Sequence, residues 1–161
     1  MLKQLNSGDL APSFETIAVG GIYGEGTPLL SSEFRDKTWA LYFYPKDDTP
    51  GCTKQACGLR DTWSKFAALN VQVFGVSVDG EKSHRKFIDK FSLPFPLLVD
   101  TEHKISENFG VWVEKSMYGK KYMGTERSTF VIGPDGRIRA VFRKVKPEEH
   151  ADILFAELTK H

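Results

Sequence analysis

Two short apolar runs, separated by a helical pattern, constrain the fold of this chain more than any other feature. Residues 39–44 and 71–78 are rich in aromatic or β-branched side chains, and each has the length of a buried strand. Between them, from Cys57 to just before Asn70, apolar residues recur at the spacing of one long amphipathic helix. Strands that alternate with helices favour a largely parallel sheet with helices on both faces.

The rest of the chain continues this alternation. Further strands are expected at 13–19, 97–99, 129–132 and 138–142, and further helices around 87–91, 102–109 and 151–158. The last two strands are joined by Pro134-Asp135-Gly136, a hairpin signal that adds antiparallel strands. Residues 112–123, which contain several aromatic and methionine side chains, are interpreted as a long loop. The order predicts one α/β domain over residues 1–161 with a thioredoxin-like fold: a central mixed sheet flanked by helices, with an N-terminal extension.

Composition and charge exclude several classes of protein. Hydrophobic residues make up 40% of the 161 residues and charged residues 27%, which excludes a disordered tail or a coiled coil. The 22 Lys and Arg residues nearly balance the 21 Asp and Glu residues, which argues against nucleic acid as a partner. The apolar runs are too short to span a membrane, and residues 1–9 lack the apolar region of a secretory signal. We therefore expect a cytoplasmic protein with no membrane or nucleic-acid partner.

The chain has only two cysteines, Cys52 and Cys57, in one local segment. A secreted disulfide scaffold carries more cysteines spread along its length, so this pair is not a stabilising framework. The two thiols are therefore inert, metal-binding or redox-active.

The segment from Pro45 to Cys52 leaves a buried strand and enters a helix. Thr49 suits the N-cap and Pro50 the first helical position, which places Cys52 at the third position of the first turn. Amides there have no partner within the helix, and the positive end of the helix dipole favours a thiolate. The same amides can bind an oxygen that gains negative charge, and Gly51 leaves the approach to the sulfur open. This local arrangement favours a thiolate nucleophile.

The residues Pro45, Thr49 and Cys52 match the Pro-x-x-x-Thr-x-x-Cys motif of peroxiredoxins. Their context resembles the peroxiredoxin Q, or bacterioferritin-comigratory-protein, subfamily. Other segments similar to that subfamily are residues 75–79, 83–84, 93–100 and 127–132. The resemblance covers nearly the whole chain. It implies an antioxidant thiol peroxidase that reduces hydrogen peroxide and organic hydroperoxides without a cofactor or metal.

The resemblance also implies a role for each motif residue. Cys52 would be the peroxidatic cysteine, Thr49 would orient the peroxide, and Pro45 would shield the pocket. Arg127 would support the thiolate and the leaving oxygen, and Cys57 matches the resolving cysteine of the Cys-x-x-x-x-Cys branch. Attack would leave a sulfenic acid, which condenses to an intramolecular Cys52–Cys57 disulfide. Thioredoxin or a glutaredoxin-like dithiol would then reduce this disulfide, and a monomer would suffice.

A structural explanation competes with each of these roles. Cys52 could be an inert buried cysteine, and Cys57 could be a small core residue on the apolar face of its helix. Thr49 could act only as an N-cap, and Arg127 could be a surface cation. His84, near a helix start, is interpreted as a cap or surface residue rather than a catalyst.

Two other functions fit the same fold. A thioredoxin-like disulfide reductase normally carries Cys-x-x-Cys, whereas four residues separate the cysteines here. A copper-binding assembly factor would use two thiolates and a histidine, usually with a membrane anchor and a Cys-x-x-x-Cys pair. A disulfide reductase would reduce insulin, whereas a peroxidase would consume hydrogen peroxide. A copper-binding assembly factor would be identified by the metal content of the purified protein.

Overall fold

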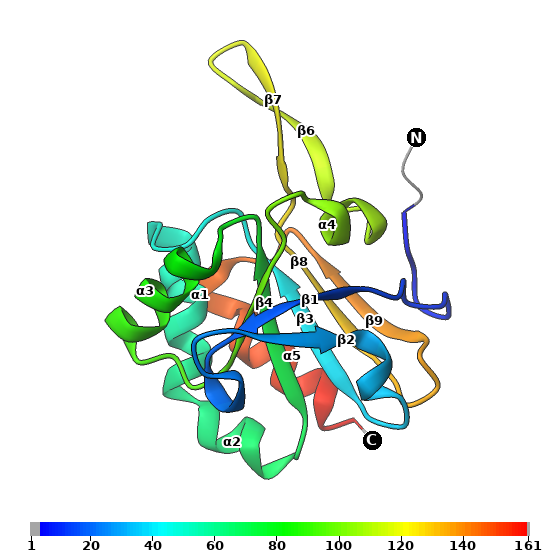
Figure 1. Cartoon of the computed structure of the whole chain (residues 1–161). Coiled ribbons are helices and arrows are strands. Elements are labelled where there is room, and N and C mark those ends of the chain that lie inside the picture. The colour runs from blue at the N-terminus through cyan, green and yellow to red at the C-terminus, as the bar shows by residue number, and fades with distance from the viewer. Residues whose placement is uncertain (1–3, 161) are drawn as a thin grey trace.

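The structure, a computed structural model, describes residues 4–160. It contains a seven-stranded sheet and a separate two-stranded ribbon (Figure 1). Along the sheet the strands are β2 (Thr27–Leu30), β1 (Glu15–Val19), β5 (Leu97–Val99), β4 (Gln72–Ser77), β3 (Trp39–Phe43), β8 (Ser128–Ile132) and β9 (Ile138–Arg143).

The mixed character of the sheet is confirmed, but the expectation that it is largely parallel is wrong. Only β3, β4 and β5 run parallel to one another, and the pairings at both ends of the sheet are antiparallel. A parallel pair needs a long crossover, which the helices between β3 and β4 and between β4 and β5 supply. The shorter connections from β1 to β2 and from β8 to β9 instead give hairpins.

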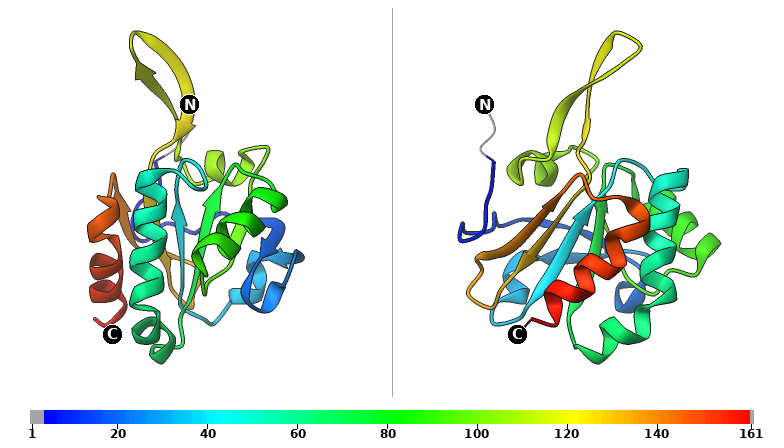
Figure 2. Two further views of the ribbon diagram at one scale, coloured as in Figure 1. Left: turned by 90° about the vertical axis from the view of Figure 1, so that its left-hand side faces the viewer. Right: turned by 180° about the vertical axis from the view of Figure 1, so that it is seen from behind.

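Helices cover both faces of the sheet, as predicted. They are α1 (Pro50–Asp61), α2 (Trp63–Ala68), α3 (Glu81–Phe91), α4 (Lys104–Asn108) and α5 (His150–Leu158). Buried side chains of α1, α2, α3 and α5 pack on one face, where α1 and α5 lie side by side (Figure 2). The other face is covered by α4 and by the short 3-10 turn Ser31–Phe34.

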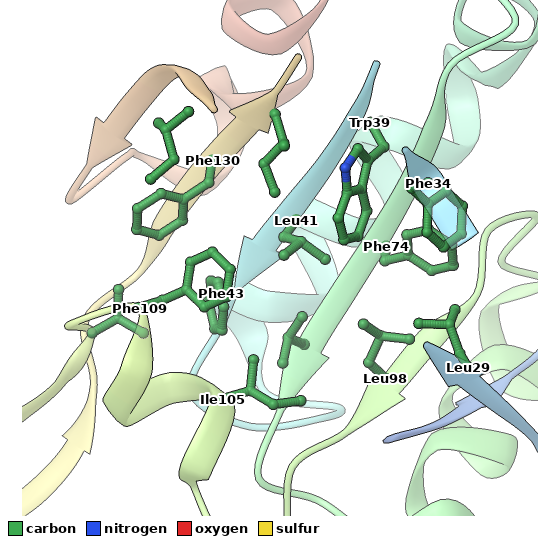
Figure 3. Close-up of a cluster of buried hydrophobic side chains, with 14 of the residues drawn as sticks. Leu29, Phe34, Trp39, Leu41, Phe43, Phe74, Leu98, Ile105, Phe109 and Phe130 are labelled. Atoms are coloured by element: carbon green, nitrogen blue, oxygen red, sulfur yellow. The ribbon is translucent and has the colours of Figure 1, made fainter. Parts of the chain in front are cut away.

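Strand β3 is buried throughout because it sits between these two layers. Trp39, Leu41 and Phe43 point into one core, and Ala40 and Tyr42 point into the other, as the two-residue period of a strand requires. Figure 3 shows the first of these cores, in which aromatic rings from several elements meet. The run of apolar residues in the sequence reflects burial on both faces.

Helix α1 begins at Pro50, as the capping pattern predicted. The expectation that one helix continues to just before Asn70 is wrong, because the helical path breaks at Thr62 before α2 starts. The Thr62 hydroxyl donates to the Gly58 carbonyl at 2.9 Å, a local bond of the kind that bends helices. The amphipathic spacing continues across the break, so periodicity alone did not reveal it.

Residues 112–123 form a hairpin, so the loop predicted there is wrong. Strands β6 (Trp112–Met117) and β7 (Lys120–Thr125) pair antiparallel and project from the body of the protein (Figures 1 and 2). Tyr118 and Gly119 connect the two strands and have φ angles of 51° and 78°. A type I′ turn requires positive φ angles at both of its central positions. Met117, Tyr118 and Met123 are exposed, so they do not cover the core.

The sheet brings distant segments to one end of the molecule. The carboxyl end of β3 leads into α1, and Phe43 at this end pairs with Ser128, the first residue of β8. The residue before β8, Arg127, therefore lies beside the connection between β3 and α1. Within residues 4–160, none of the helices is long and apolar enough to cross a bilayer.

Candidate active site

Cys52 occupies the position that the capping pattern predicted. Thr49 is the N-cap of α1 and Pro50 its first residue, so Cys52 is the third residue of the first turn. Its side chain is only 2% exposed. Pro45 is half-buried where the chain leaves β3. Both Cys52 and Cys57 are free thiols, so the structure represents the reduced protein.

Thr49 has the backbone of an N-cap but does not cap the helix with its side chain. Its hydroxyl instead donates to the Lys46 carbonyl at 2.9 Å, which is an alternative local bond for a threonine in a turn. The predicted side-chain cap is therefore wrong. The consequence is chemical, because the first-turn amides of α1 stay open to a ligand and the Thr49 oxygen can still accept a hydrogen bond.

Arg127 lies across the first turn of α1. Its Nη2 donates to the Cys52 sulfur at 3.5 Å, and its Nη1 donates to the side-chain oxygen of Gln55. A Cβ atom on Gly51 would lie 3.2 Å from the same Nη2, so the absence of a side chain allows this close approach. The structure thus places a permanent positive charge with several donors beside the sulfur.

Gln55 is a site residue that the sequence analysis missed. It is 1% exposed and stands three residues after Cys52. Residues three apart lie on the same face of a helix, so both side chains face Arg127. This spacing was the signal that could have identified Gln55.

Cys57 is half-buried and lines a cavity of about 390 Å³. Thr49 and Thr53 line this cavity together with Cys57, and Arg127 does not. Cys57 is therefore not packed away as a core residue. The two sulfurs of the reduced protein face different surroundings on one helix.

A buried polar cluster lies near Cys52. His150, on α5, is fully buried, and its Nε2 lies 2.8 Å from the Thr129 hydroxyl. Burial, with a smaller effect of the nearby Arg127 charge, lowers the pKa of His150 to about 3. His150 is therefore neutral at physiological pH. Burial also raises the pKa of Tyr42 well above its usual value, and the negative charges of Cys52 and Asp47 raise it further.

Lys115 of β6 adds a second cation near this site, also missed in the sequence. Partial burial, and then repulsion by Arg127, lowers the pKa of Lys115, while Glu126 and Cys52 act in the opposite direction. Lys115 was missed because residues 112–123 were expected to form a loop, in which the position of a side chain cannot be predicted. In the β6–β7 hairpin, Lys115 pairs with Tyr122, and this register fixes its position.

His84 is not the cap or surface residue that the sequence analysis expected. It is fully buried, and its Nδ1 lies 2.7 Å from the carboxylate of Asp47 in the connection between β3 and α1. Asp47 was also missed, because two adjacent aspartates in a polar segment read as a solvated turn. Only the packing of α3 against the sheet shows that Asp47 is buried.

The site as a whole suits attack by a thiolate. Cys52 has open helix amides, a guanidinium in contact and little exposure to water. Such an arrangement stabilises negative charge on the sulfur and on an oxygen that departs from a bound molecule. Among residues 4–160, no three His, Cys, Asp or Glu side chains group closely enough to hold a metal ion.

Known proteins are similar to this chain along almost its full length. Residues 7–141 match the AhpC/TSA family. The Peroxiredoxin Bcp of Bacillus subtilis is 49% identical over 143 residues, covering 89% of this chain and 88% of that protein. A PrxQ mutant of Xylella fastidiosa has a TM-score of 0.89 and 34% identity, covering 99% of this chain and 98% of that one. The bacterioferritin comigratory protein of Xanthomonas campestris, studied for its alkyl peroxide reduction, has a TM-score of 0.82 and 32% identity, with coverage of 100% and 99%.

Proposed function

Because the chain belongs to the AhpC/TSA family, as a thiol-dependent peroxidase of the peroxiredoxin Bcp type, we propose that Cys52 is the sulfur that attacks the peroxide. The thioredoxin-like fold predicted from the order of elements is confirmed by its similarity to these structures. The observation that carries the proposal is the contact between Arg127 and Cys52 at the N-terminus of α1.

The first step forms a sulfur–oxygen bond and breaks the oxygen–oxygen bond of the peroxide. The Cys52 thiolate supplies an electron pair, so the sulfur is oxidised to a sulfenic acid. The other oxygen departs with the bonding pair, takes up a proton and leaves as water or an alcohol. Arg127 and the open amides of α1 stabilise the charge that moves onto this oxygen. Thr49 accepts a hydrogen bond from the peroxide, and Pro45 keeps water from the sulfur.

The second step uses Cys57. Its sulfur attacks the sulfenic sulfur of Cys52, a disulfide forms, and water leaves. An external dithiol, thioredoxin or a glutaredoxin-like protein, then exchanges with this disulfide and restores both thiols. The cavity beside Cys57 supports the proposal, because it gives that sulfur access to solvent while Cys52 stays covered.

The proposed substrates are hydrogen peroxide and organic hydroperoxides. The relative from Xanthomonas campestris is described by its reduction of alkyl peroxides, which supports the second class. We assign the reaction to the reducing environment of the cytoplasm, where a dithiol pool can recycle the disulfide.

The proposal is tested with four variants in a peroxide assay coupled to thioredoxin and its reductase. Cys52→Ser should abolish peroxide consumption, and Cys57→Ser should react once and stall at the sulfenic acid. Arg127→Ala should slow the attack roughly ten- to a hundredfold, because it removes a hydrogen bond from a charged group. The control is Arg60→Ala, since Arg60 lies on the same helix but bonds Asp61 and the Phe91 carbonyl.

Activity retained by Cys52→Ser would contradict the assignment of the nucleophile. Full turnover of Cys57→Ser with thioredoxin as the only reductant would show that Cys57 does not resolve the sulfenic acid. Insulin reduction without peroxide consumption would instead identify a disulfide reductase.

We also propose that the protein acts as a monomer. Both cysteines lie on α1, so resolution needs no second chain. The rate of disulfide formation should then be independent of protein concentration, and sedimentation equilibrium should give the mass of one chain. A rate that rises with concentration would indicate resolution between chains.

A further inference from the structure

His84 is a fully buried ionisable residue that the proposed mechanism does not use. Its two ring nitrogens face two oxygens: Nδ1 lies 2.7 Å from Oδ2 of Asp47, and Nε2 lies 2.8 Å from the Leu98 carbonyl. A carbonyl oxygen can only accept, so Nε2 carries a proton. The other ring nitrogen, Nδ1, forms its hydrogen bond with the Asp47 carboxyl group. The ring is therefore bonded at both ends, to the active-site connection on one side and to strand β5 on the other.

Asp47 is held by more than His84. It is 6% exposed, and its carboxylate accepts hydrogen bonds from the Tyr44 hydroxyl at 2.6 Å and the Ser83 hydroxyl at 2.8 Å. Its backbone amide donates to Asp79 at 2.8 Å. Hydrogen bonds in a low-dielectric interior are strong, and a buried carboxylate is costly when it loses a partner. The middle of the connection is thus tied to β4, α3 and β5 at once.

This anchoring lies directly beside the reacting groups. Asp47 stands two residues after Pro45 and two before Thr49. Between Asp47 and Thr49, Asp48 has a left-handed backbone with φ 56°, which sets the direction in which the chain enters α1. A shift of Asp47 would therefore move Thr49 and the first turn of α1 relative to Arg127.

We propose that His84 is a positioning residue for peroxide reduction: by holding Asp47, it places Thr49 and the first turn of α1 against Arg127 and so keeps Cys52 reactive. This inference rests on the proposed role of Cys52. His84 touches neither the sulfur nor the peroxide in this scheme. It acts through the backbone between β3 and α1.

Two substitutions separate the two hydrogen bonds of the ring. In His84→Asn the amide nitrogen takes the place of Nδ1 and can still donate to Asp47, whereas in His84→Gln it takes the place of Nε2 and can reach only Leu98. His84→Gln should lower the second-order rate constant of Cys52 oxidation about tenfold and reduce the thiolate fraction, since a buried bond to a charged group is lost. His84→Asn should stay within about threefold of the wild type. Both should lose similar thermal stability, because each loses one bond of the ring.

Stopped-flow fluorescence gives the rate constant, ultraviolet absorbance gives the thiolate fraction, and thermal unfolding gives the stability. Asp47→Asn should reproduce His84→Gln. His103→Gln is the matched control, because it removes a histidine–carboxylate contact of the same 2.7 Å length, to Glu107, outside the site. Equal rates for His84→Gln and His84→Asn, or a wild-type rate and thiolate fraction in His84→Gln, would overturn the inference.

If the His84 variants do not fold, Tyr44→Phe and Ser83→Ala decide instead, since each removes another bond to Asp47 and leaves His84 in place. Each should slow Cys52 oxidation by about twofold or more. Wild-type rates in both would overturn the inference. Failure of the proposed function has a different signature, because the wild-type protein itself would then not consume peroxide.

Discussion

At the scale of single residues, two glycines of α1 have different tasks. Gly51 faces Arg127, where an added Cβ would lie 3.2 Å from Nη2 and 3.5 Å from Pro147. Gly58 faces α5, where an added Cβ would lie 3.9 Å from the Cβ of Ala151, an ordinary contact. At the first position a Cβ would require the guanidinium to move by a few tenths of an ångström, and the second position has room for a methyl group.

This difference predicts opposite outcomes for the same substitution. Gly51→Ala should displace Arg127 and slow Cys52 oxidation several-fold, although alanine favours the helix. Gly58→Ala should leave the attack on peroxide unchanged and raise the free energy of unfolding by about 0.5–1 kcal/mol, since glycine is a poor helix residue. Single-turnover kinetics and urea unfolding of both variants test this pair. A wild-type rate in Gly51→Ala would contradict the close approach.

His150 predicts how stability depends on pH. Its pKa is about 3 in the folded protein and about 6.5 in an unfolded chain, so the unfolded chain binds more protons between these values. Stability should therefore fall as the pH drops below about 6.5, by about 2 kcal/mol from pH 7 to pH 5 for this residue alone. Above about pH 6.5, His150 is neutral in both the folded and the unfolded chain, so it does not make stability depend on pH.

His150→Phe removes the titrating group and keeps a ring of similar shape. The loss of unfolding free energy between pH 7 and pH 5 should be about 2 kcal/mol smaller in this variant than in the wild type. At pH 7 the variant should be less stable than the wild type, because Thr129 loses its partner, and at pH 5 this deficit should be smaller by the same amount. Urea unfolding at the two pH values measures the difference, and equal losses in both proteins would show that His150 does not titrate in this way.

At the scale of the element, α1 carries both cysteines in a geometry that forbids their disulfide. Five residues of helix rise about 7.5 Å and turn about 500°, which puts the two Cα atoms roughly 8.7 Å apart. A disulfide usually allows no more than about 6.8 Å. The structure has an intact helix over Pro50–Asp61 with both thiols free. The bridge can therefore form only if the first turns of α1 unwind.

Amide hydrogen exchange over residues 50–60 measures this unwinding directly. Protection should be high in the reduced protein and lost in the oxidised one, while β3 and β4 stay protected in both. Unwinding also removes the helix N-terminus from Cys52, so the oxidised protein should not bind peroxide. The same protection in both redox states would show that the disulfide forms without melting α1.

At the scale of the whole molecule, one sheet divides two cores. Trp39 lies in the core covered by α4, and Trp63 packs at the core covered by α1, α3 and α5. Because β3 contributes side chains to both cores, neither can be lost without the other. We expect the predicted single domain over residues 1–161 to unfold in one cooperative step.

Tryptophan fluorescence can follow each core separately. Trp63→Phe with Trp112→Phe leaves Trp39 as the only tryptophan, and Trp39→Phe with Trp112→Phe leaves Trp63. Within each variant, the urea midpoint from fluorescence should coincide with the midpoint from circular dichroism. Separate midpoints would mean that the two cores unfold independently.

Features that depend on neighbouring residues could be predicted from the amino-acid sequence. The N-terminus of α1 and the place of Cys52 in its first turn follow from Thr49 and Pro50. The strands other than β2, β6 and β7 follow from their apolar runs, and those three were not predicted. Capping and periodicity act over a few residues, so they can be recognised without a fold. Local patterns failed where a threonine hydroxyl bonded a nearby carbonyl, at Thr49 instead of capping α1 and at Thr62 at the break before α2. They also failed at the β6–β7 hairpin, whose type I′ turn is formed by Tyr118 and Gly119.

The distant residues that surround Cys52 could not be predicted from local patterns, because strand pairing and helix packing bring them there. Arg127 reaches it because β8 pairs antiparallel with β3, and His84 reaches Asp47 because α3 packs beside the same end of the sheet. The antiparallel pairings of β1 with β2 and with β5 also depended on the tertiary structure, whereas the β8–β9 hairpin was predicted from Pro134-Asp135-Gly136. Cys52 and Arg127, for example, are 75 positions apart in the sequence. The physical basis of these contacts is burial: His84 and Asp47 look like surface residues in a polar sequence, and packing turns them into partners that must satisfy each other.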